Sequence, residues 1–133
     1  MAFGASDAIV VFITAASVED ALRVADKLVQ EELAACVQVL PQVQSIYRWK
    51  EKVERQSEVL LLAKTLRSKF EALERAVREV HSYEVPEVAA IGLCEVSKSY
   101  LDWLVSAVDS SARPLACPSK ASEKRSSINL DPR

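Results

Sequence analysis

The hydrophobic positions of the chain change their period several times within the first hundred residues. The run AIVVFIT at residues 8–14 is apolar on both faces and too short for a helix, so it predicts a central strand. Apolar side chains then recur at helical spacing, and Ser17 with Asp20 forms a capping box that predicts the helix start. The expected apolar positions of this helix are Val18, Leu22, Ala25, Leu28, Val29 and Leu33.

A period of two follows and predicts an extended hairpin. Alternating apolar and polar residues from Ala35 to Lys50 are typical of one long strand. Pro41 lacks a backbone donor and therefore marks a bulge, an edge segment or a change of partner. Beyond a polar segment, the apolar run at residues 59–65 predicts the returning strand.

The rest of the folded part predicts a helix, a strand and a short helix. The second helix is expected to begin near Ser68, in a capping box with Glu71, and to end around His81. An apolar run at residues 87–94 predicts a fourth strand, and residues 99–108 predict the last helix. The order strand, helix, strand, strand, helix, strand predicts an α+β split βαβ fold, with two helices on one face of an antiparallel sheet.

Composition divides the chain into one domain, residues 1–112, and a tail, residues 113–133. The tail is rich in Ser and Pro and carries 5 Lys+Arg against 2 Asp+Glu, which predicts a disordered basic segment. The domain carries 12 Lys+Arg against 17 Asp+Glu, so nucleic acid is not an expected partner.

The three cysteines, Cys36, Cys94 and Cys117, suggest a reducing compartment. They are odd in number and form no C-x-x-C pair, which argues against a disulfide framework or a zinc knuckle. Cys36 is expected to be a buried thiol. No run approaches the roughly 20 apolar residues of a membrane span, so we expect a cytoplasmic protein without a membrane partner.

Four segments, taken in order, resemble the CutA family of divalent-cation tolerance proteins. They are AACV entering the long strand, SIYRWK in the hairpin, HSYEVPE after the second helix, and YLDWL in the last helix. The resemblance covers residues 8–108. It implies a cytoplasmic homotrimer with a ferredoxin-like protomer, similar in architecture to PII signalling proteins, and an association with divalent cations such as copper.

Physical reasoning also favours self-association. Two helices in a small protomer cannot cover a hairpin of this length, and Tyr47 and Trp49 near its end would leave an aromatic patch exposed. Contacts between copies would remove this exposure. The expected interface anchors are Tyr47, Trp49 and Trp103.

The metal site implied by the resemblance is incomplete in this chain. The family's proposed copper ligands are a cysteine at the end of the first strand and a histidine pair at the end of the second helix. The corresponding residues are Ile13, Val80 and His81, so one imidazole is left. We expect a divalent cation such as Cu(II) to use His81 and Glu84, with Tyr83 and Glu87 in the same cleft and with ligands shared between chains.

Other roles for the same residues stay open. His81 at a helix end is also suited to capping the helix or to acid–base chemistry. A regulatory trimer of the PII type would instead hold an anionic metabolite, using Arg48, Lys50 and Lys64 together with His81 and Glu84. An enzyme is not expected, because no nucleophile triad or phosphate loop is present in the sequence.

Overall fold

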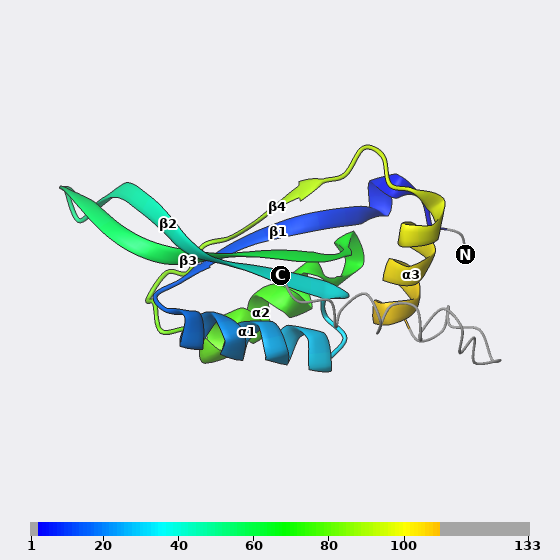
Figure 1. Ribbon diagram of the computed structural model, residues 1–133, viewed down its shortest axis with the longest axis horizontal. Helices are drawn as coiled ribbons and strands as arrows, with labels where there is room; N and C mark the ends of the chain where they lie inside the picture. Colours follow the sequence, from blue (N-terminus) through cyan, green and yellow to red (C-terminus); the bar gives the residue numbers. More distant parts are fainter. Residues whose placement is uncertain (1–2, 110–133) are drawn as a thin grey trace.

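The computed structural model of the chain describes residues 3–109 (Figure 1). The predicted tail at residues 113–133 lies outside this range. Short 3-10 helices at Ala5–Asp7 and Arg67–Lys69 accompany the main elements. These are β1 Ala8–Ala15, α1 Val18–Gln30, β2 Cys36–Trp49, β3 Lys52–Leu66, α2 Phe70–Val80, β4 Val88–Gly92 and α3 Lys98–Val108.

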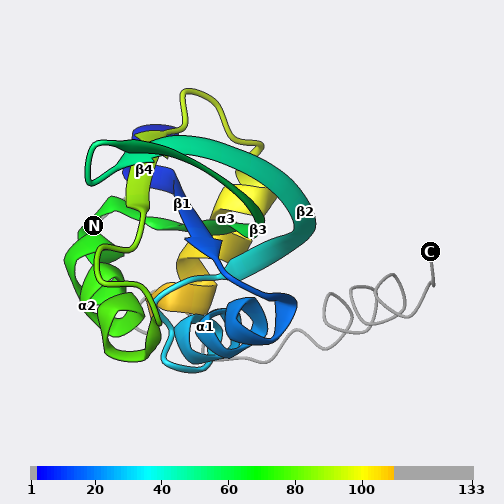
Figure 2. The ribbon, with the colours of Figure 1, turned by 90° about the vertical axis from the view of Figure 1, so that its left-hand side faces the viewer.

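The four strands form one antiparallel sheet in the order β2-β3-β1-β4. Helices α1 and α2 lie side by side on one face of it, as Figures 1 and 2 show from two directions. This arrangement confirms the predicted α+β split βαβ fold. The two strands of the hairpin extend well beyond the part of the sheet that the helices cover (Figure 1).

The core lies between the sheet and the two helices. Alternate residues of β1, namely Ile9, Val11 and Ile13, are buried in it, as the period of a strand requires. Leu28 of α1 and Leu73 of α2 are fully buried against them. A second cluster fixes α3 to the end of β3 and contains Leu66, Leu104, Val105 and Val108.

The hairpin is longer than the sequence predicted. A register shift between Leu40 and Val43 places a bulge near Pro41, which is one of the three features expected there. The returning strand, however, begins at Lys52 and not near residue 59. The polar segment before residue 59 pairs with β2 because this half of the hairpin lies largely outside the hydrophobic core, where polarity does not indicate a loop.

One expectation about helix α1 and one about α2 are corrected. Val18, Leu22 and Val29 of α1 are exposed, because the stripe that faces the core consists of Ala21, Val24, Ala25 and Leu28. Ser68 does not cap α2, since a 3-10 turn precedes that helix and Lys69 occupies its N-cap position without a side-chain bond. Ser17 does cap α1, and its Oγ accepts a hydrogen bond from the Asp20 N–H at 3.1 Å.

Substituting Ser17 by alanine should therefore destabilise the protein, while the same change at Ser68 should not. Loss of an N-cap hydrogen bond typically lowers the free energy of unfolding by about 1 kcal/mol. Ser68→Ala is the matched control and should change it by less than about 0.5 kcal/mol. Urea denaturation at a fixed protein concentration measures both values, and equal effects would contradict the capping assignment.

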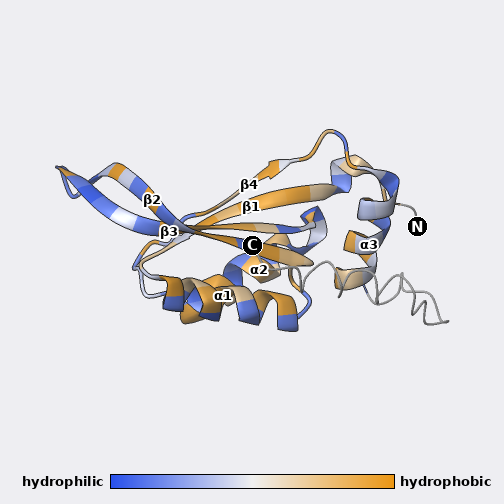
Figure 3. Cartoon of the chain, in the orientation of Figure 1, coloured by the Kyte–Doolittle hydropathy of each residue, from blue (hydrophilic) through white to orange (hydrophobic). Residues whose placement is uncertain are grey.

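The face of the sheet opposite α1 and α2 is apolar along β1 and β4, while Lys64 and Gln38 form a polar pair on it across β3 and β2. Val10 and Phe12 point to it because their neighbours in β1 point into the core. Leu60 and Leu62 of β3 lie on the same face, and Ile91 of β4 is 56% exposed there. Figure 3 shows the hydrophobic colouring along β1 and β4. Helix α3 packs at one end of the sheet, whereas α1 and α2 lie on the opposite face, so an apolar surface is left uncovered in the described residues 3–109.

Candidate functional site: an acidic and aromatic cleft

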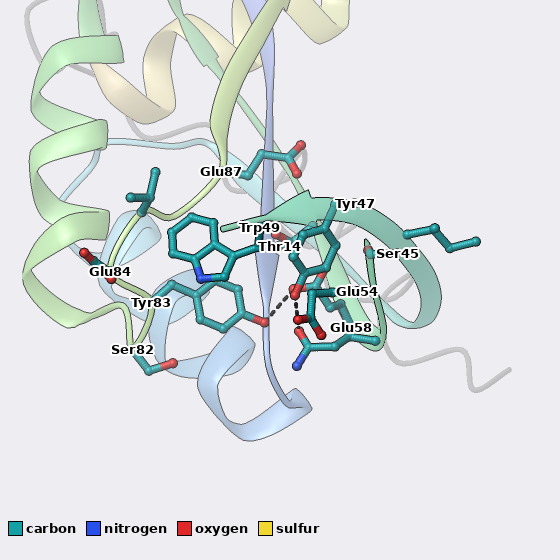
Figure 4. A pocket seen from close by; sticks show the side chains of 13 residues that line it. Thr14, Ser45, Tyr47, Trp49, Glu54, Glu58, Ser82, Tyr83, Glu84 and Glu87 are labelled. Atoms are coloured by element: carbon teal, nitrogen blue, oxygen red, sulfur yellow. Dashed lines mark hydrogen bonds between the residues drawn. The ribbon is translucent and has the colours of Figure 1, made fainter. Parts of the chain in front are cut away.

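A cavity of about 730 Å³ lies between the outer half of the hairpin and the segment at residues 82–87 that joins α2 to β4. Figure 4 shows the side chains that surround it. Apart from Ile46, the hairpin contributes alternate residues, because strand side chains project to the two faces in turn. The lining residues are Thr14, Ser45, Ile46, Tyr47, Trp49, Glu54, Gln56, Glu58, Ser82, Tyr83, Glu84, Val85 and Glu87.

Cross-strand pairing sets the hairpin wall of the cleft. Tyr47 pairs with Glu54, and Ser45 pairs with Gln56, so these side chains share one face. The Tyr47 hydroxyl donates a hydrogen bond to Gln56 Oε1 at 2.7 Å. The rings of Tyr47 and Trp49 and the carboxylates of β3 are thereby directed toward the same space (Figure 4).

Glu58 is the most buried acidic residue of the cleft, with 7% of its surface exposed. The Tyr83 hydroxyl donates to Glu58 Oε2 at 2.5 Å and links the segment at residues 82–87 to the hairpin. Burial, followed by this hydrogen bond to Glu58, raises the pKa of Tyr83 well above its ordinary value. The phenol therefore stays protonated and acts as a donor.

His81 links the segment at residues 82–87 to β1 through hydrogen bonds. It is the C-cap of α2, which confirms the predicted helix end, and its Nε2 lies 2.6 Å from the Thr14 carbonyl oxygen. Its Nδ1 accepts a hydrogen bond from the Tyr83 N–H at 3.1 Å, so the ring proton is assigned to Nε2. The imidazole also lies against the Tyr83 ring, at 4.8 Å between centroids. Both ring nitrogens are engaged, so coordination of a metal would replace one of these bonds.

The ionisable groups of the cleft are carboxylates and phenols. Four glutamates line it, and none of its lining residues within positions 3–109 is Lys, Arg or His. Burial and then the charge of Glu58 raise the pKa of Glu87. Burial, followed by Glu58 and Glu54, also raises the pKa of Tyr47. The cleft therefore has a negative field that favours cations.

The raised pKa of Glu87 provides a direct test of this field. We expect Glu58→Gln to lower the pKa of Glu87 toward its ordinary value of 4.5, because one of its two causes is removed. In the parent, ionisation of Glu87 opposes folding. The stability that the protonated Glu87 contributes is therefore fully present below pH 4.5 and is lost as pH rises through the raised pKa. Carboxyl NMR titration measures this pKa. Glu95→Gln, at an exposed glutamate outside the cleft, is the control, and an unchanged pKa in Glu58→Gln would contradict the coupling.

The structure brings together some of the residues predicted from sequence and separates others. Tyr83, Glu84, Glu87, Tyr47 and Trp49 line the cleft, and His81 lies directly beside it.

The predicted basic residues do not line it. Lys64 donates to Gln38 on the sheet, Lys50 Nζ lies 5.6 Å from the Trp49 ring centroid, and Arg48 is also absent from the lining. Trp103 packs with the α3 cluster, away from the cleft.

The two positions where the resemblance implies further metal ligands belong to the core. Ile13 is fully buried, and Val80 packs against the same cluster. In the part of the chain that the structure describes, no three His, Cys, Asp or Glu side chains are grouped so that they could hold a metal ion. Cys36 is a free thiol that is half-buried, not fully buried as expected, because β2 is an edge strand.

The sequence interpretation missed Glu54 and Glu58. Both lie in the polar segment that was expected to connect two strands. Their alternation with outward-facing residues, opposite Tyr47 and its neighbours, was the available signal.

The fold and the site together define a small ferredoxin-like protein with an extended hairpin and an acidic, aromatic cleft. A family model described as CutA1 divalent ion tolerance protein matches residues 9–107. The chain belongs to this family, as its sequence motifs predicted.

Curated relatives agree with this assignment. The divalent-cation tolerance protein CutA of Thermus thermophilus is 46% identical over 95 residues, covering 71% of this chain and 92% of the relative. Protein CutA of Homo sapiens is 44% identical over 93 residues, which cover 70% of this chain. The match spans only 52% of the human protein, about half of its length.

Solved structures show the same fold. CutA from Xylella fastidiosa superposes with a TM-score of 0.76 at 36% identity, covering 78% of this chain and 100% of that one. A periplasmic divalent cation tolerance protein CutA from Archaeoglobus fulgidus gives a TM-score of 0.75 at 34% identity, covering 77% and 99%.

Proposed function

We propose that this protein acts in divalent-cation tolerance as a homotrimer that binds cations in the acidic cleft. The observation that supports this role most directly is the charge of the cleft, whose lining contains four glutamates and, within residues 3–109, no basic side chain. Carboxylate oxygens are ligands that divalent cations accept. Membership of a divalent ion tolerance family is consistent with this chemistry.

The uncovered sheet face supports self-association. An apolar surface formed by Phe12, Leu62, Ile91 and their neighbours is typical of a contact between protein subunits. The long hairpin provides a second surface, on which Tyr47 and Trp49 are each more than a third exposed. We propose that these residues and Trp103 contribute to the trimer contacts.

The proposed cation ligands are Glu84 and Glu87, which lie on separate sides of the cleft in Figure 4, so each would contribute to a different ion. Because three suitable side chains do not meet within residues 3–109, we expect weak binding by one chain, or a ligand set completed by a neighbouring copy. Copper, the cation named by the resemblance, prefers imidazole to carboxylate ligands. For His81 to bind it through Nε2, the bond to Thr14 has to break.

Calorimetric titration with Cu(II), Zn(II) and Ni(II) tests this proposal. Glu84→Gln should weaken binding of each cation by roughly tenfold, since a charged ligand is lost. His81→Asn should leave all three affinities unchanged, because both ring nitrogens of His81 are already engaged in hydrogen bonds.

The controls distinguish cation binding by Glu84 and Glu87 from cation binding by His81. Glu95→Gln removes an exposed carboxylate outside the cleft and should behave as the parent. Unchanged affinities in Glu84→Gln would contradict cation binding by Glu84. A fall in Cu(II) affinity in His81→Asn alone would assign the imidazole as a copper ligand.

The alternative role, a PII-like trimer that binds an anionic metabolite, gains no support from the cleft. An anion there would meet the carboxylates of Glu54, Glu58, Glu84 and Glu87, while the predicted basic residues lie elsewhere. We therefore retain the cation-binding role.

We further propose that this role is non-catalytic and cytoplasmic. Free Cys36 and Cys94 fit a reducing compartment. No helix within residues 3–109 is long and apolar enough to cross a membrane. Relatives occupy several compartments, since the Arabidopsis thaliana protein is described as chloroplastic and the Archaeoglobus fulgidus structure as periplasmic.

A further inference from the structure

The inner end of the cleft holds a buried negative charge without a positive partner. Glu58 is 93% buried, since 7% of its surface is exposed, and its one hydrogen bond in residues 3–109 comes from the neutral Tyr83 hydroxyl. None of the salt bridges within that range involves Glu58. A buried carboxylate without a counter-charge is unfavourable, so a ligand that supplies the positive charge would be stabilised there.

Aromatic rings surround the same end of the cleft. Tyr47, Trp49 and Tyr83 line it, and in Figure 4 their rings gather beside the carboxylates of Glu54 and Glu58. The face of an aromatic ring attracts cations, and Trp attracts them most strongly. The chain already uses this interaction, because Lys50 Nζ lies 5.6 Å from the Trp49 ring centroid.

A buried carboxylate beside aromatic rings favours an organic ammonium ion over a small divalent metal ion. A small divalent ion is strongly hydrated and requires several oxygen ligands, which residues 3–109 do not group together. A substituted ammonium ion is larger and weakly hydrated, and it is recognised by aromatic faces with a carboxylate nearby. The cavity of about 730 Å³ is large enough for such an organic ion.

We propose that the inner end of the cleft binds a small organic cation of the substituted ammonium class, with its nitrogen near Glu58 and its alkyl groups against Tyr47, Trp49 and Tyr83. This inference rests on the proposed role of the cleft as a cation site and adds a ligand class. Divalent ions would bind through Glu84 and Glu87.

Calorimetric titration of the full chain with choline tests the proposal. The matched probe is 3,3-dimethylbutan-1-ol, which has nearly the same shape and no charge. We expect choline to bind at least tenfold more tightly than the alcohol, because the carboxylate and the rings recognise charge. An equal affinity for the two probes, or no binding of choline, would overturn the proposal.

Three variants locate the site. Glu58→Gln keeps the shape of the side chain and removes its charge, and we expect it to weaken choline binding by roughly tenfold. Trp49→Leu removes an aromatic face and should weaken it by about fivefold. Glu95→Gln, outside the cleft, should leave it unchanged, and choline binding that survives Glu58→Gln would contradict the assignment.

The outcome also separates this inference from the proposed function. Zn(II) binding that is sensitive to Glu84→Gln, without choline binding, would leave the divalent-cation role standing and remove the organic cation. Choline binding without any divalent-cation binding would support the organic-cation inference and contradict the divalent-cation role. If a neighbouring copy supplies the counter-charge of Glu58, the assembled protein will not bind choline, which also overturns the inference.

Discussion

Replacing Ile91 by glutamate should convert the assembled protein into monomers. Ile91 lies on the uncovered sheet face and is 56% exposed in the single chain, so the monomer itself should tolerate a charge there. Within a contact between copies, the same unpaired charge would be buried, at a cost of roughly 3–5 kcal/mol. Light scattering should show about three times the chain mass of 14.7 kDa for the parent and the mass of one chain for the variant.

Leu22→Glu is the matched control for this experiment. Leu22 is similarly exposed, at 49%, but lies on α1, on the opposite side of the sheet. We expect this variant to assemble as the parent does. A parent that scatters as one chain, or an Ile91→Glu variant that still assembles, would contradict the proposed interface.

Replacing Leu61 by alanine should produce the largest loss of stability. Leu61 is fully buried at the centre of β3 and packs in the cluster between the sheet and the helices. Truncating a leucine at such a position lowers the free energy of unfolding by about 2–5 kcal/mol, because the lost transfer free energy adds to the cost of a cavity.

Urea denaturation measures this effect at one fixed protein concentration, because assembly also contributes to the apparent stability. Leu40→Ala provides the comparison, since Leu40 is 39% exposed on β2 and should lose less than about 1.5 kcal/mol. Similar losses at the two positions would show that the core is not located as described.

The proposed trimer contacts and the proposed ligand sites involve some of the same cleft residues. Assembly through the uncovered sheet face would bring copies of the hairpin close to one another, and Tyr47 and Trp49 would then contribute both to contacts and to ligand recognition. Comparing ligand binding in the parent and in the Ile91→Glu monomer separates these contributions. Divalent-cation affinity that falls in the monomer would indicate ligands shared between copies.

Much of the fold followed from local sequence. Side-chain periodicity predicted the main helices and strands, apart from the outer half of β3. Ser17 marked the start of α1, and Pro41 indicated an irregularity in β2. The segment from His81 to Glu87 was recognised as a candidate site from its residue types and from its resemblance to the family's motif. These features depend on neighbours in the chain, so a local pattern was sufficient to predict them.

The chemistry of the cleft was decided by tertiary structure. Glu58 and Tyr83 meet although 25 residues separate them, and His81 reaches the Thr14 carbonyl across 67 residues. Both contacts depend on the register of the hairpin and on the path of the segment after α2, which no local pattern specifies. Because of this long-range geometry, both ring nitrogens of His81 form hydrogen bonds and Lys64 lies outside the cleft. It also places the buried carboxylate of Glu58 beside aromatic rings.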